Sequence, residues 1–413
     1  MTRRRRGRTG APRVLIIIQN LAVPFDRRVW LESQSLVSAG YDVSVVCPND
    51  NDTVGHQVID GVRVYTYRAY APGGSAKGYV AEYAFSFLAT CWLAFRARGL
   101  RGFDIVQACN PPDIFWPLAR VLRWLDGSRF VFDHHDLCPE LYESRFAGRK
   151  DAAYRGLLAL ERRTFREADH VISTNESYRE IAMRRGGKTA AEVSVVRTGP
   201  DTARLYAGPP DPQLRRGRAH LVAYLGVMGP QDGVDLAVQA ADVIVNELGR
   251  TDISFLFMGT GDCYEDVVAL RSQLRLDEFV EMPGRVPDSY VASALSTADV
   301  GLCPDPKNPL NDLSTMNKTM EYMAFGVPVV AYDLRETRVS AGDAAVYARS
   351  DDVADFAKAI VSLVDDRERR REMGRLGRAR VVDELQWSHQ RASYLKVYAD
   401  LMAPTTAVES TRA

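Results

Sequence analysis

The chain has 413 residues, of which 46% are hydrophobic and 26% are charged. This length exceeds what one ordinary core holds and predicts two domains of about 200 residues each, while the composition is too polar for an integral membrane protein. Arg and Lys together number 53, as do Asp and Glu, so the net charge gives no reason to expect a nucleic-acid partner.

The chain begins with a basic segment, residues 1–12, in which five arginines stand among small residues. We expect a disordered tail there, with a weak electrostatic hold on anionic lipid as the alternative. The apolar run that follows is too short for a secretory signal peptide and lacks a small-residue cleavage site. A second disordered tail is expected at residues 404–413.

Residues 13–197 alternate apolar, β-branched runs with helical patterns, which predicts a parallel α/β domain. Helices are expected at about Arg27–Ala39, where Gly40 ends the helix, and near Tyr154–Ala168. The expected strands are Val14–Gln19, Val43–Cys47, Val62–Tyr67, Asp104–Ala108, Phe130–Phe132, His170–Ser173 and Val193–Arg197.

The most apolar stretch of the chain is Tyr79–Phe95. It contains Glu82 and is shorter than the ~20 residues that span a bilayer. We therefore expect a buried or membrane-surface helix rather than a transmembrane one.

Residues 198–219 are rich in Pro, Gly and charge and are expected to link two domains. The α/β alternation restarts in residues 220–385, and two or three helices are expected to close the chain, the last at residues 386–403. Two doubly wound domains predict a ligand cleft between the carboxyl ends of their strands. The expected strands are Leu221–Leu225, Ile253–Met258, Phe279–Met282, Val300–Cys303 and Pro328–Ala331, and the expected helices include Val234–Leu248, Asp288–Thr297 and Met316–Phe325.

The densest group of candidate binding residues lies near the start of the last of these helices. Ser314 or Thr315 is expected to cap the helix, and Lys318 stands in its first turn. Free backbone N–H groups, the positive end of the helix dipole and an ammonium then converge, as a phosphate site requires. Glu321 follows one turn later, where it either pairs with Lys318 on the surface or accepts hydrogen bonds from a ribose diol.

A second group of polar residues follows the strand at Phe130–Phe132. His134 and His135, flanked by Asp133 and Asp136, could form a metal site. No further ligand stands at a fixed spacing, so we favour a sugar-contacting or structural histidine, with an aspartate orienting its ring.

The segment Glu321–Val330 (EYMAFGVPVV) resembles the donor-binding segment of the retaining family 4 glycosyltransferases, also called glycosyltransferase group 1. The sequence S-x-x-N-K before Glu321 resembles a branch of that family engaged in polysaccharide assembly. Further matches, in the family's order, are Asp26, Arg27, Arg28 and Val29 with Glu32 and Gly40 in the first helix, His135 with Asp136 beside the cleft, and Trp387 with Ser388 before the final helix.

The resemblance implies an α/β fold of the GT-B type, with two doubly wound Rossmann-like domains facing a cleft. It implies an acceptor-side domain at residues 13–197, a nucleotide-sugar-binding domain at residues 220–385, and a terminal helix that returns to the first domain. The activity implied is transfer of a hexose-type sugar, with retention and without a metal or other cofactor, from a nucleotide diphosphate donor to a glycan or lipid-linked acceptor.

By the same resemblance His135 positions the donor sugar, Lys318 faces the diphosphate and Glu321 holds the ribose. The remaining candidate residues are Gly284, Arg285, Val286, Asp312, Ser314, Met316 and Asn317 for the donor, and Asp26, Arg27, Arg28, His134 and Asp136 on the acceptor or cleft side. For Asp26, Arg27 and Arg28 a solvated first turn of a helix is an equal alternative.

The sequence departs from the family pattern at two places. Leu313 stands where the family often has a second Glu, so Asp312 or Asn311 would contact the donor hexose instead. The loop Gly226–Gly233 lacks the usual Arg and Lys, which leaves Lys318, with Arg285 as a second cation, to neutralise the diphosphate.

Other functions remain open at this point. A sugar-nucleotide epimerase shares the architecture, and Leu313 and Asp232 are also compatible with an inactive nucleotide-sugar-binding partner. A dinucleotide oxidoreductase is disfavoured because no G-x-G-x-x-G follows Val14–Gln19. The six scattered cysteines form no C-x-x-C pair and predict reduced thiols, hence a cytoplasmic protein, with peripheral contact at the inner face of the membrane as an option.

Overall fold

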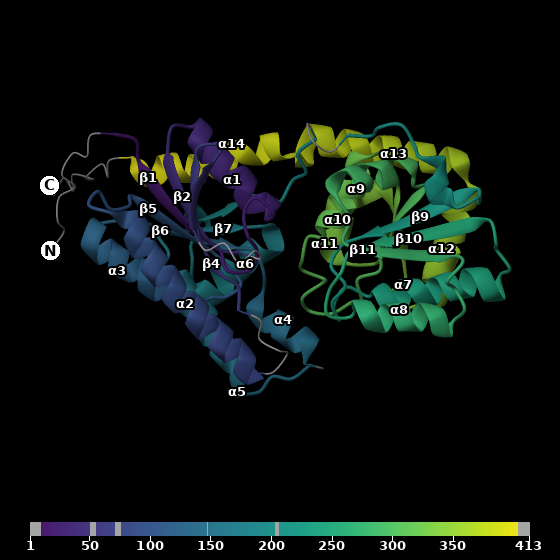
Figure 1. Cartoon of the computed structure of the whole chain (residues 1–413), viewed down its shortest axis with the longest axis horizontal. Helices are drawn as coiled ribbons and strands as arrows, with labels where there is room; N and C mark the ends of the chain where they lie inside the picture. Colours follow the sequence, from purple (N-terminus) through teal and green to yellow (C-terminus); the bar gives the residue numbers. More distant parts are fainter. Residues whose placement is uncertain (1–9, 50–54, 71–75, 147, 203–205, 404–413) are drawn as a thin grey trace, which may run out of the picture. The chain divides into compact units, whose positions relative to one another are not determined.

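The computed structural model forms two compact units, each built around its own β-sheet (Figure 1). Unit 1 comprises three stretches of chain, namely the residues up to Pro139, Asp151–Val196, and the residues from Arg391 onward. Unit 2 comprises Glu140–Lys150 and Arg197–Gln390. The structure describes residues 10–49, 55–70, 76–146, 148–202 and 206–403.

The sheet of unit 1 has eight strands in the order β3-β4-β2-β1-β5-β6-β7-β8. All neighbours are parallel except β3 and β4. Parallel strands covered on both faces are continuous apolar runs, as the fully buried β1 illustrates. The strands are β1 (Arg13–Ile17), β2 (Asp42–Asn49), β3 (Gly55–Ile59), β4 (Val62–Arg68), β5 (Ile105–Cys109), β6 (Arg129–His134), β7 (His170–Ser173) and β8 (Val193–Val195).

Side chains of α2, α3, α5 and α6 pack against one hydrophobic core in unit 1, and Figure 1 shows α2 and α3 on the same side of the sheet. The helix α1 begins where the Asp26 carboxylate accepts a hydrogen bond from the Val29 N–H (2.9 Å). The helices of unit 1 are α1 (Arg27–Ser38), α2 (Ala76–Arg98), α3 (Trp116–Asp126), α5 (Ala152–Glu167) and α6 (Glu176–Gly186), whereas α4 (Cys138–Arg145) and α14 (Trp387–Met402) cross from one unit to the other in sequence.

The sheet of unit 2 has six parallel strands in the order β11-β10-β9-β12-β13-β14. Its strands are β9 (His220–Leu225), β10 (Ile253–Met258), β11 (Val280–Gly284), β12 (Val300–Cys303), β13 (Val329–Tyr332) and β14 (Ala345–Ala348). Its helices are α7 (Val234–Asp242), α8 (Tyr264–Gln273), α9 (Asp288–Thr297), α10 (Asn317–Ala324), α11 (Arg335–Ala341), α12 (Val353–Asp365) and α13 (Arg367–Arg380).

The predicted α/β class with two doubly wound sheets is confirmed, and every predicted strand is present with small shifts of its ends. The prediction that the strand at Pro328–Ala331 completes the second sheet is wrong, because β14 pairs with β13. Four helices rather than two or three follow that strand within the described part of the chain. The edge strand β3 was missed because four of its five residues are exposed and no apolar run marks it.

Two further predictions concern the surroundings of the chain. All six cysteines are free, as predicted. No helix among the described residues is long and apolar enough to cross a membrane. The predicted tails fall on residues 1–9 and 404–413, which lie outside the described residues, and only Gly10–Pro12 of the first is described.

Candidate functional site

Each unit carries a cluster of polar side chains at the carboxyl ends of the strands beside its switch point, where the strand order reverses. This point lies between β1 and β5 in unit 1, and between β9 and β12 in unit 2. Ligands of open α/β sheets bind at such points.

Lys318, in the first turn of α10, is the cation of the unit 2 cluster. Its side chain is 9% exposed, and Nζ lies 2.7 Å from Oδ1 of Asp305 and 3.8 Å from Oδ1 of Asp232. The ammonium also lies 5.1 Å from the centroid of the Tyr224 ring. Asp305 follows β12 and Asp232 lies in the loop after β9, so the lysine joins the two sides of the switch point.

The electrostatics of this cluster differ from those expected of a free phosphate-binding lysine. Burial would lower the pKa of Lys318, but Asp305, Tyr224 and Asp232 raise it well above its ordinary value, so the lysine is charged. Burial raises the pKa of Asp232 to about 6, against the opposing effect of Lys318. Asp305 is buried, and its Oδ2 has no hydrogen-bond partner among the described residues. The Lys318 charge is therefore already balanced by carboxylate.

Glycines allow the loops around this cluster to touch one another. A Cβ at Gly259 (φ +138°) would lie 1.8 Å from the carbonyl oxygen of Gly226. A Cβ at Gly233 (φ +64°) would lie 2.2 Å from the carbonyl oxygen of Pro304. Only glycine fits either position, which explains the glycine-rich ends of β9 and β10.

The start of α10 is open. Its N-cap is Met316, whose side chain makes no capping hydrogen bond. The prediction that Ser314 or Thr315 caps the helix is wrong, because the helix begins at Asn317 and the Ser314 hydroxyl donates back to the Leu310 carbonyl (2.8 Å). The first backbone N–H groups of the helix and the positive end of its dipole therefore lie beside Lys318, with no capping bond from the Met316 side chain.

The other predicted donor residues lie on several elements of unit 2. Glu321 is partly exposed one turn along α10. Asp312 accepts a hydrogen bond from the Arg335 N–H (2.9 Å) at the start of α11 and lies 3.6 Å from Nζ of Lys307. Leu313 is partly exposed beside it. These contacts give Asp312 a part in holding α11.

The predicted base-binding segment follows β11. Gly284 has φ +74°, and its carbonyl accepts a hydrogen bond from the Gly259 N–H (2.9 Å). Arg285 is exposed and Val286 is partly buried. The asparagine predicted as an alternative sugar contact, Asn311, is buried and donates to the carbonyls of Gln231 and Pro306 (2.8 Å each).

Arg28 is the centre of the unit 1 cluster. Its guanidinium donates to Oδ1 of Asp133 (2.9 Å) and to the carbonyl of Val196 (2.8 Å), and lies 3.0 Å from Oε1 of Glu32. Arg28, Asp133 and Glu32 are buried. Burial would raise the pKa of Asp133, but Arg28 and His135 lower it, whereas burial and then Asp133 raise the pKa of Glu32 well above its usual range. Of the two carboxyls, Asp133 is thus the one that ionises more readily.

His135 lies at the exposed margin of this cluster, with 14% of its side chain accessible. Its Nε2 lies 2.7 Å from Oδ2 of Asp133 and 2.9 Å from Nε of Arg28. Nε of Arg28 donates to Nε2 of His135, and the same ring nitrogen contacts the Asp133 carboxylate in a way that depends on the ring tautomer. Arg28 and Asp133 together fix the orientation of the ring.

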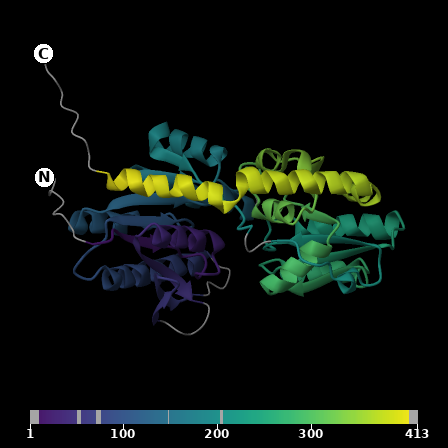
Figure 2. The same cartoon turned by 90° about the horizontal axis from the view of Figure 1, so that it is seen from above.

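A second layer of hydrogen bonds fixes Asp133. The Gln107 amide donates to Oδ2 of Asp133 (3.0 Å) and to Oε2 of Glu32 (2.7 Å). Its oxygen accepts from Tyr394 (2.9 Å) and from Tyr398, both on α14. Figure 2 shows this part of α14, in yellow, running alongside the strands of unit 1.

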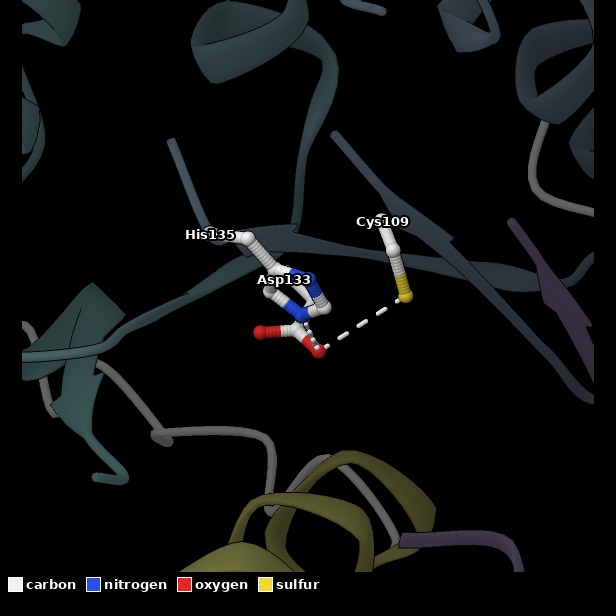
Figure 3. A group of neighbouring side chains, drawn as sticks. All are labelled: Cys109, Asp133 and His135. Carbon is white, nitrogen blue, oxygen red and sulfur yellow. Dashed lines mark hydrogen bonds and ion pairs between the residues drawn. The ribbon is translucent and has the colours of Figure 1, made fainter. Parts of the chain in front are cut away.

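Cys109, Asp133 and His135 offer one ligand atom each within 4.8 Å of one another (Figure 3). The chemistry of the group does not suit a metal ion. Burial and the nearby carboxyls raise the pKa of the Cys109 thiol well above its ordinary value, whereas a metal needs the thiolate. Arg28 already neutralises Asp133 and lies 2.9 Å from the histidine nitrogen.

The remaining predicted residues of unit 1 fall into two groups. Arg27 is exposed, and Asp26 caps α1. His134 is buried against Phe165 and Tyr178, and burial lowers its pKa to about 3, so its neutral ring packs in the interior out of reach of a ligand.

Asn110, which the sequence did not single out, holds the backbone of the predicted histidine. Its Oδ1 accepts from the N–H groups of His135 (2.6 Å) and Asp136 (3.1 Å), and its amide donates to the Asp136 carbonyl (2.7 Å) and to Asp113 (3.1 Å). Burial raises the pKa of Asp113 to about 7. The sequence could indicate only those contacts of this cluster whose partners are close along the chain, namely Arg28 with Glu32 and Asp133 with His135.

Comparison with known proteins supports a single family. Residues 219–366 match a family model described as glycosyl transferases group 1, and residues 26–199 match a glycosyl transferase 4-like domain. Glycogen synthase of Mycobacterium tuberculosis is 25% identical over 393 residues, which cover 90% of each chain.

Solved structures share the fold at low identity. Sucrose-phosphate synthase of Thermosynechococcus elongatus superimposes with a TM-score of 0.77 at 18% identity, covering 94% of this chain and 99% of that one. HepE of Anabaena, in complex with UDP and glucose, gives a TM-score of 0.71 at 12% identity, covering 94% and 100%. With both halves matched by the family and the whole fold by its structures, the chain belongs to the group 1 glycosyltransferases and has the GT-B fold.

Proposed function

We propose that this glycosyltransferase moves a hexose-type sugar from a nucleotide diphosphate donor to a glycan or lipid-linked acceptor in polysaccharide assembly, with retention and without a metal ion. The observation that carries the proposal is the start of α10 beside Lys318, at the switch point of unit 2, where the N-cap residue Met316 makes no side-chain capping bond. Glu321 lies one turn further along the same helix, in reach of a ribose next to that phosphate position. The UDP and glucose in the HepE structure support the donor class.

The proposed chemistry needs stabilisation of a diphosphate leaving group as the anomeric C–O bond breaks. The dipole and N–H groups of α10 supply this electrostatically, and they carry the larger share because Asp305 balances the charge of Lys318. The acceptor hydroxyl attacks the anomeric carbon from the same face from which the diphosphate departs. The proton of this hydroxyl passes to the departing phosphate. His135, oriented by Asp133 and Arg28, positions a hydroxyl of the donor sugar. The residues named for the donor and for the acceptor side remain proposals in these roles.

Cytoplasm is the proposed compartment, since all six cysteines are free and four of them are buried. No cofactor is proposed beyond the donor itself.

A thermal-shift panel of nucleoside diphosphates and their hexose conjugates, with Mg²⁺ and with EDTA, tests the donor site. We expect stabilisation by at least one diphosphate in EDTA. Glu321→Ala is expected to weaken that binding by about ten- to a hundredfold, because a carboxylate that accepts two ribose hydroxyls contributes about 1.5 to 3 kcal/mol. Glu372→Ala, which alters a glutamate that is 57% exposed on α13, is the matched control.

The outcomes separate the alternatives. Binding that strictly requires Mg²⁺ would contradict the metal-free mechanism, and unchanged binding by Glu321→Ala would remove the ribose assignment. With the best donor, transfer or slow hydrolysis with the anomeric configuration kept supports the proposal. Epimerised donor without acceptor would identify an epimerase, and binding without any turnover would identify an inactive binding partner.

A further inference from the structure

The outer face of α2 is apolar, whereas the outer face of a surface helix is normally polar. Leu88 and Trp92 are 67% and 59% exposed. Glu82, the acid of this helix, lies away from the stripe and accepts a hydrogen bond from Gln19 (2.7 Å). The exposed positions between residues 81 and 95 recur with the periodicity of one helix face, and they are Ala81, Ala84, Phe85, Leu88, Trp92 and Phe95.

The neighbouring helix α3 extends this surface. Its Trp124 is 80% exposed. Nη2 of Arg98 on α2 lies 2.6 Å from Oδ1 of Asp126 on α3, and both helices bury their inner faces in the same core. Their outer faces therefore point away from the same side of the sheet. We define the aromatic face as Phe85, Leu88, Trp92, Phe95, Leu100, Val121, Trp124 and Leu125.

The exposed hydrophobic side chains of the aromatic face are clustered in one part of the chain. Its eight residues lie within a tenth of the chain, yet they are eight of the 19 large hydrophobic side chains that are exposed among the described residues. Clusters of this kind mark surfaces that dock onto another body.

Charge around the aromatic face has one sign. Arg96 lies over the Trp92 ring (5.7 Å to the centroid), and Arg101 and Arg120 are exposed nearby in sequence. Glu167 lies close to Arg120 (3.6 Å), but it also contacts Arg123 and Arg163. The four acids between residues 76 and 129 each accept a hydrogen bond inside unit 1, and they are Glu82, Asp104, Asp113 and Asp126.

We propose that the aromatic face docks onto the surface of a membrane that contains anionic lipid. Tryptophan beside arginine is the composition of a helix that lies in the headgroup region, where indole rings insert and guanidinium groups meet phosphate. A second copy of the chain fits less well, because a two-fold interface would bring the arginines of one face against those of the other. This docking goes beyond sugar transfer and does not depend on it.

The first described residues lie at one end of this surface. Nη2 of Arg101 lies 3.5 Å from the carbonyl of Ala11 and is the group that a Cβ at Gly10 would meet. The described chain therefore begins next to Arg101, and five arginines precede it in the sequence within residues 1–9.

Flotation of the full-length protein with vesicles tests the proposal. Phosphatidylcholine vesicles are compared with vesicles that also contain phosphatidylglycerol, at low and high salt. We expect retention by the anionic vesicles that falls with salt. Trp92→Gln with Trp124→Gln should weaken it by about tenfold, and Arg96→Glu by at least about fivefold. Removal of residues 1–9 should reduce it further.

Leu248→Gln, at a leucine that is 48% exposed in unit 2, is the matched control and should bind like the wild type. Thermal unfolding of each variant verifies that the exposed substitutions leave the fold intact. Wild-type protein that ignores anionic vesicles, or tryptophan variants that bind as well as the control, would overturn the proposal. Self-association of the wild type that the tryptophan substitutions abolish would also overturn it, in favour of an interface between copies.

Discussion

Nζ of Lys318 lies 2.7 Å from Oδ1 of Asp305, with both side chains buried at the carboxyl ends of β9 and β12. Asp232 lies on the other side of the ammonium, 3.8 Å away. Two carboxyl groups thus share one cation at the place proposed for a diphosphate. Such a cluster favours anion binding less than a free lysine does.

Asp305→Asn removes one negative charge from this cluster while keeping the size of the side chain. We expect nucleoside diphosphate to bind up to about tenfold more tightly, because the repulsion of one nearby charge is lost. Isothermal titration calorimetry at low salt measures the change. Asp400→Asn, at an exposed position on α14, is the control. Weaker or equal binding by Asp305→Asn would contradict a role for Lys318 at the diphosphate.

Asp133→Ala removes the carboxylate that neutralises Arg28 in the interior of unit 1. We expect a loss of about 3 to 5 kcal/mol in the free energy of unfolding, because a buried charge is left without its partner. Urea denaturation followed by circular dichroism measures this. The exposed pair of Lys396 and Asp400 is the comparison, and Asp400→Ala should cost no more than about 0.5 kcal/mol. Similar losses for the two variants would show that Arg28 finds another partner.

Asp113 predicts a pH dependence of stability. Burial raises its pKa to about 7 in the folded chain, against about 3.9 in an unfolded one. The folded state holds the proton on the Asp113 carboxyl more tightly than the unfolded state does. The stabilisation that results is complete below about pH 4 and is lost as the pH rises through about 7. The loss amounts to at most about 4 kcal/mol.

Asp113→Asn should remove most of that dependence. The stability of wild type and variant, measured by urea denaturation between pH 4 and 8, should therefore converge or cross as the pH rises. Asp400→Asn serves again as the exposed control. A constant difference between wild type and Asp113→Asn over this range would show that Asp113 is ionised throughout in the folded chain.

Gly259→Ala should open the loops of unit 2. The added Cβ would lie 1.8 Å from the Gly226 carbonyl oxygen, so the backbone must move. We expect a loss of at least about 2 kcal/mol in stability and weaker binding of nucleoside diphosphate. Gly249→Ala tests the backbone conformation alone, since Gly249 has φ +66° with nothing within 4 Å of its Cβ, and should cost about 1 kcal/mol. If Gly259→Ala and Gly249→Ala lowered the free energy of unfolding by the same amount, the loops of unit 2 would have separated without an additional loss of stability.

The sheets could be predicted because parallel strands covered on both faces are continuous apolar runs. β10 and β12 illustrate this, with the same ends in the prediction and in the structure. The strand β3 (GHQVI) carries no such run, since it lies at an exposed edge. The helix α3 has Phe115 at its N-cap, which makes no side-chain capping bond, so only the proline in its first turn marks its start.

The candidate site was only partly predictable, for a different reason. Lys318, Glu321 and His135 stand in local patterns that the sequence displays. Their surroundings come from residues remote in sequence, and Gln107 meets Tyr394 across 287 residues. Local periodicity carries no trace of such a contact, so the balancing of Lys318 by Asp305 became apparent only in three dimensions.

The hydrogen bonds from α14 to Gln107 also bear on the order in which the chain is made. Unit 1 takes its first stretches from residues up to Val196, but Tyr394 and Tyr398 leave the ribosome only after the whole of Arg197–Gln390. At about 5 to 20 residues per second, the first half waits roughly 10 to 40 s for the tyrosines that complete its buried network. During that time Glu32, Asp133 and Arg28 lack their final neighbours. Nascent chains stalled before Arg391 should therefore be more sensitive to protease in unit 1 than the finished protein.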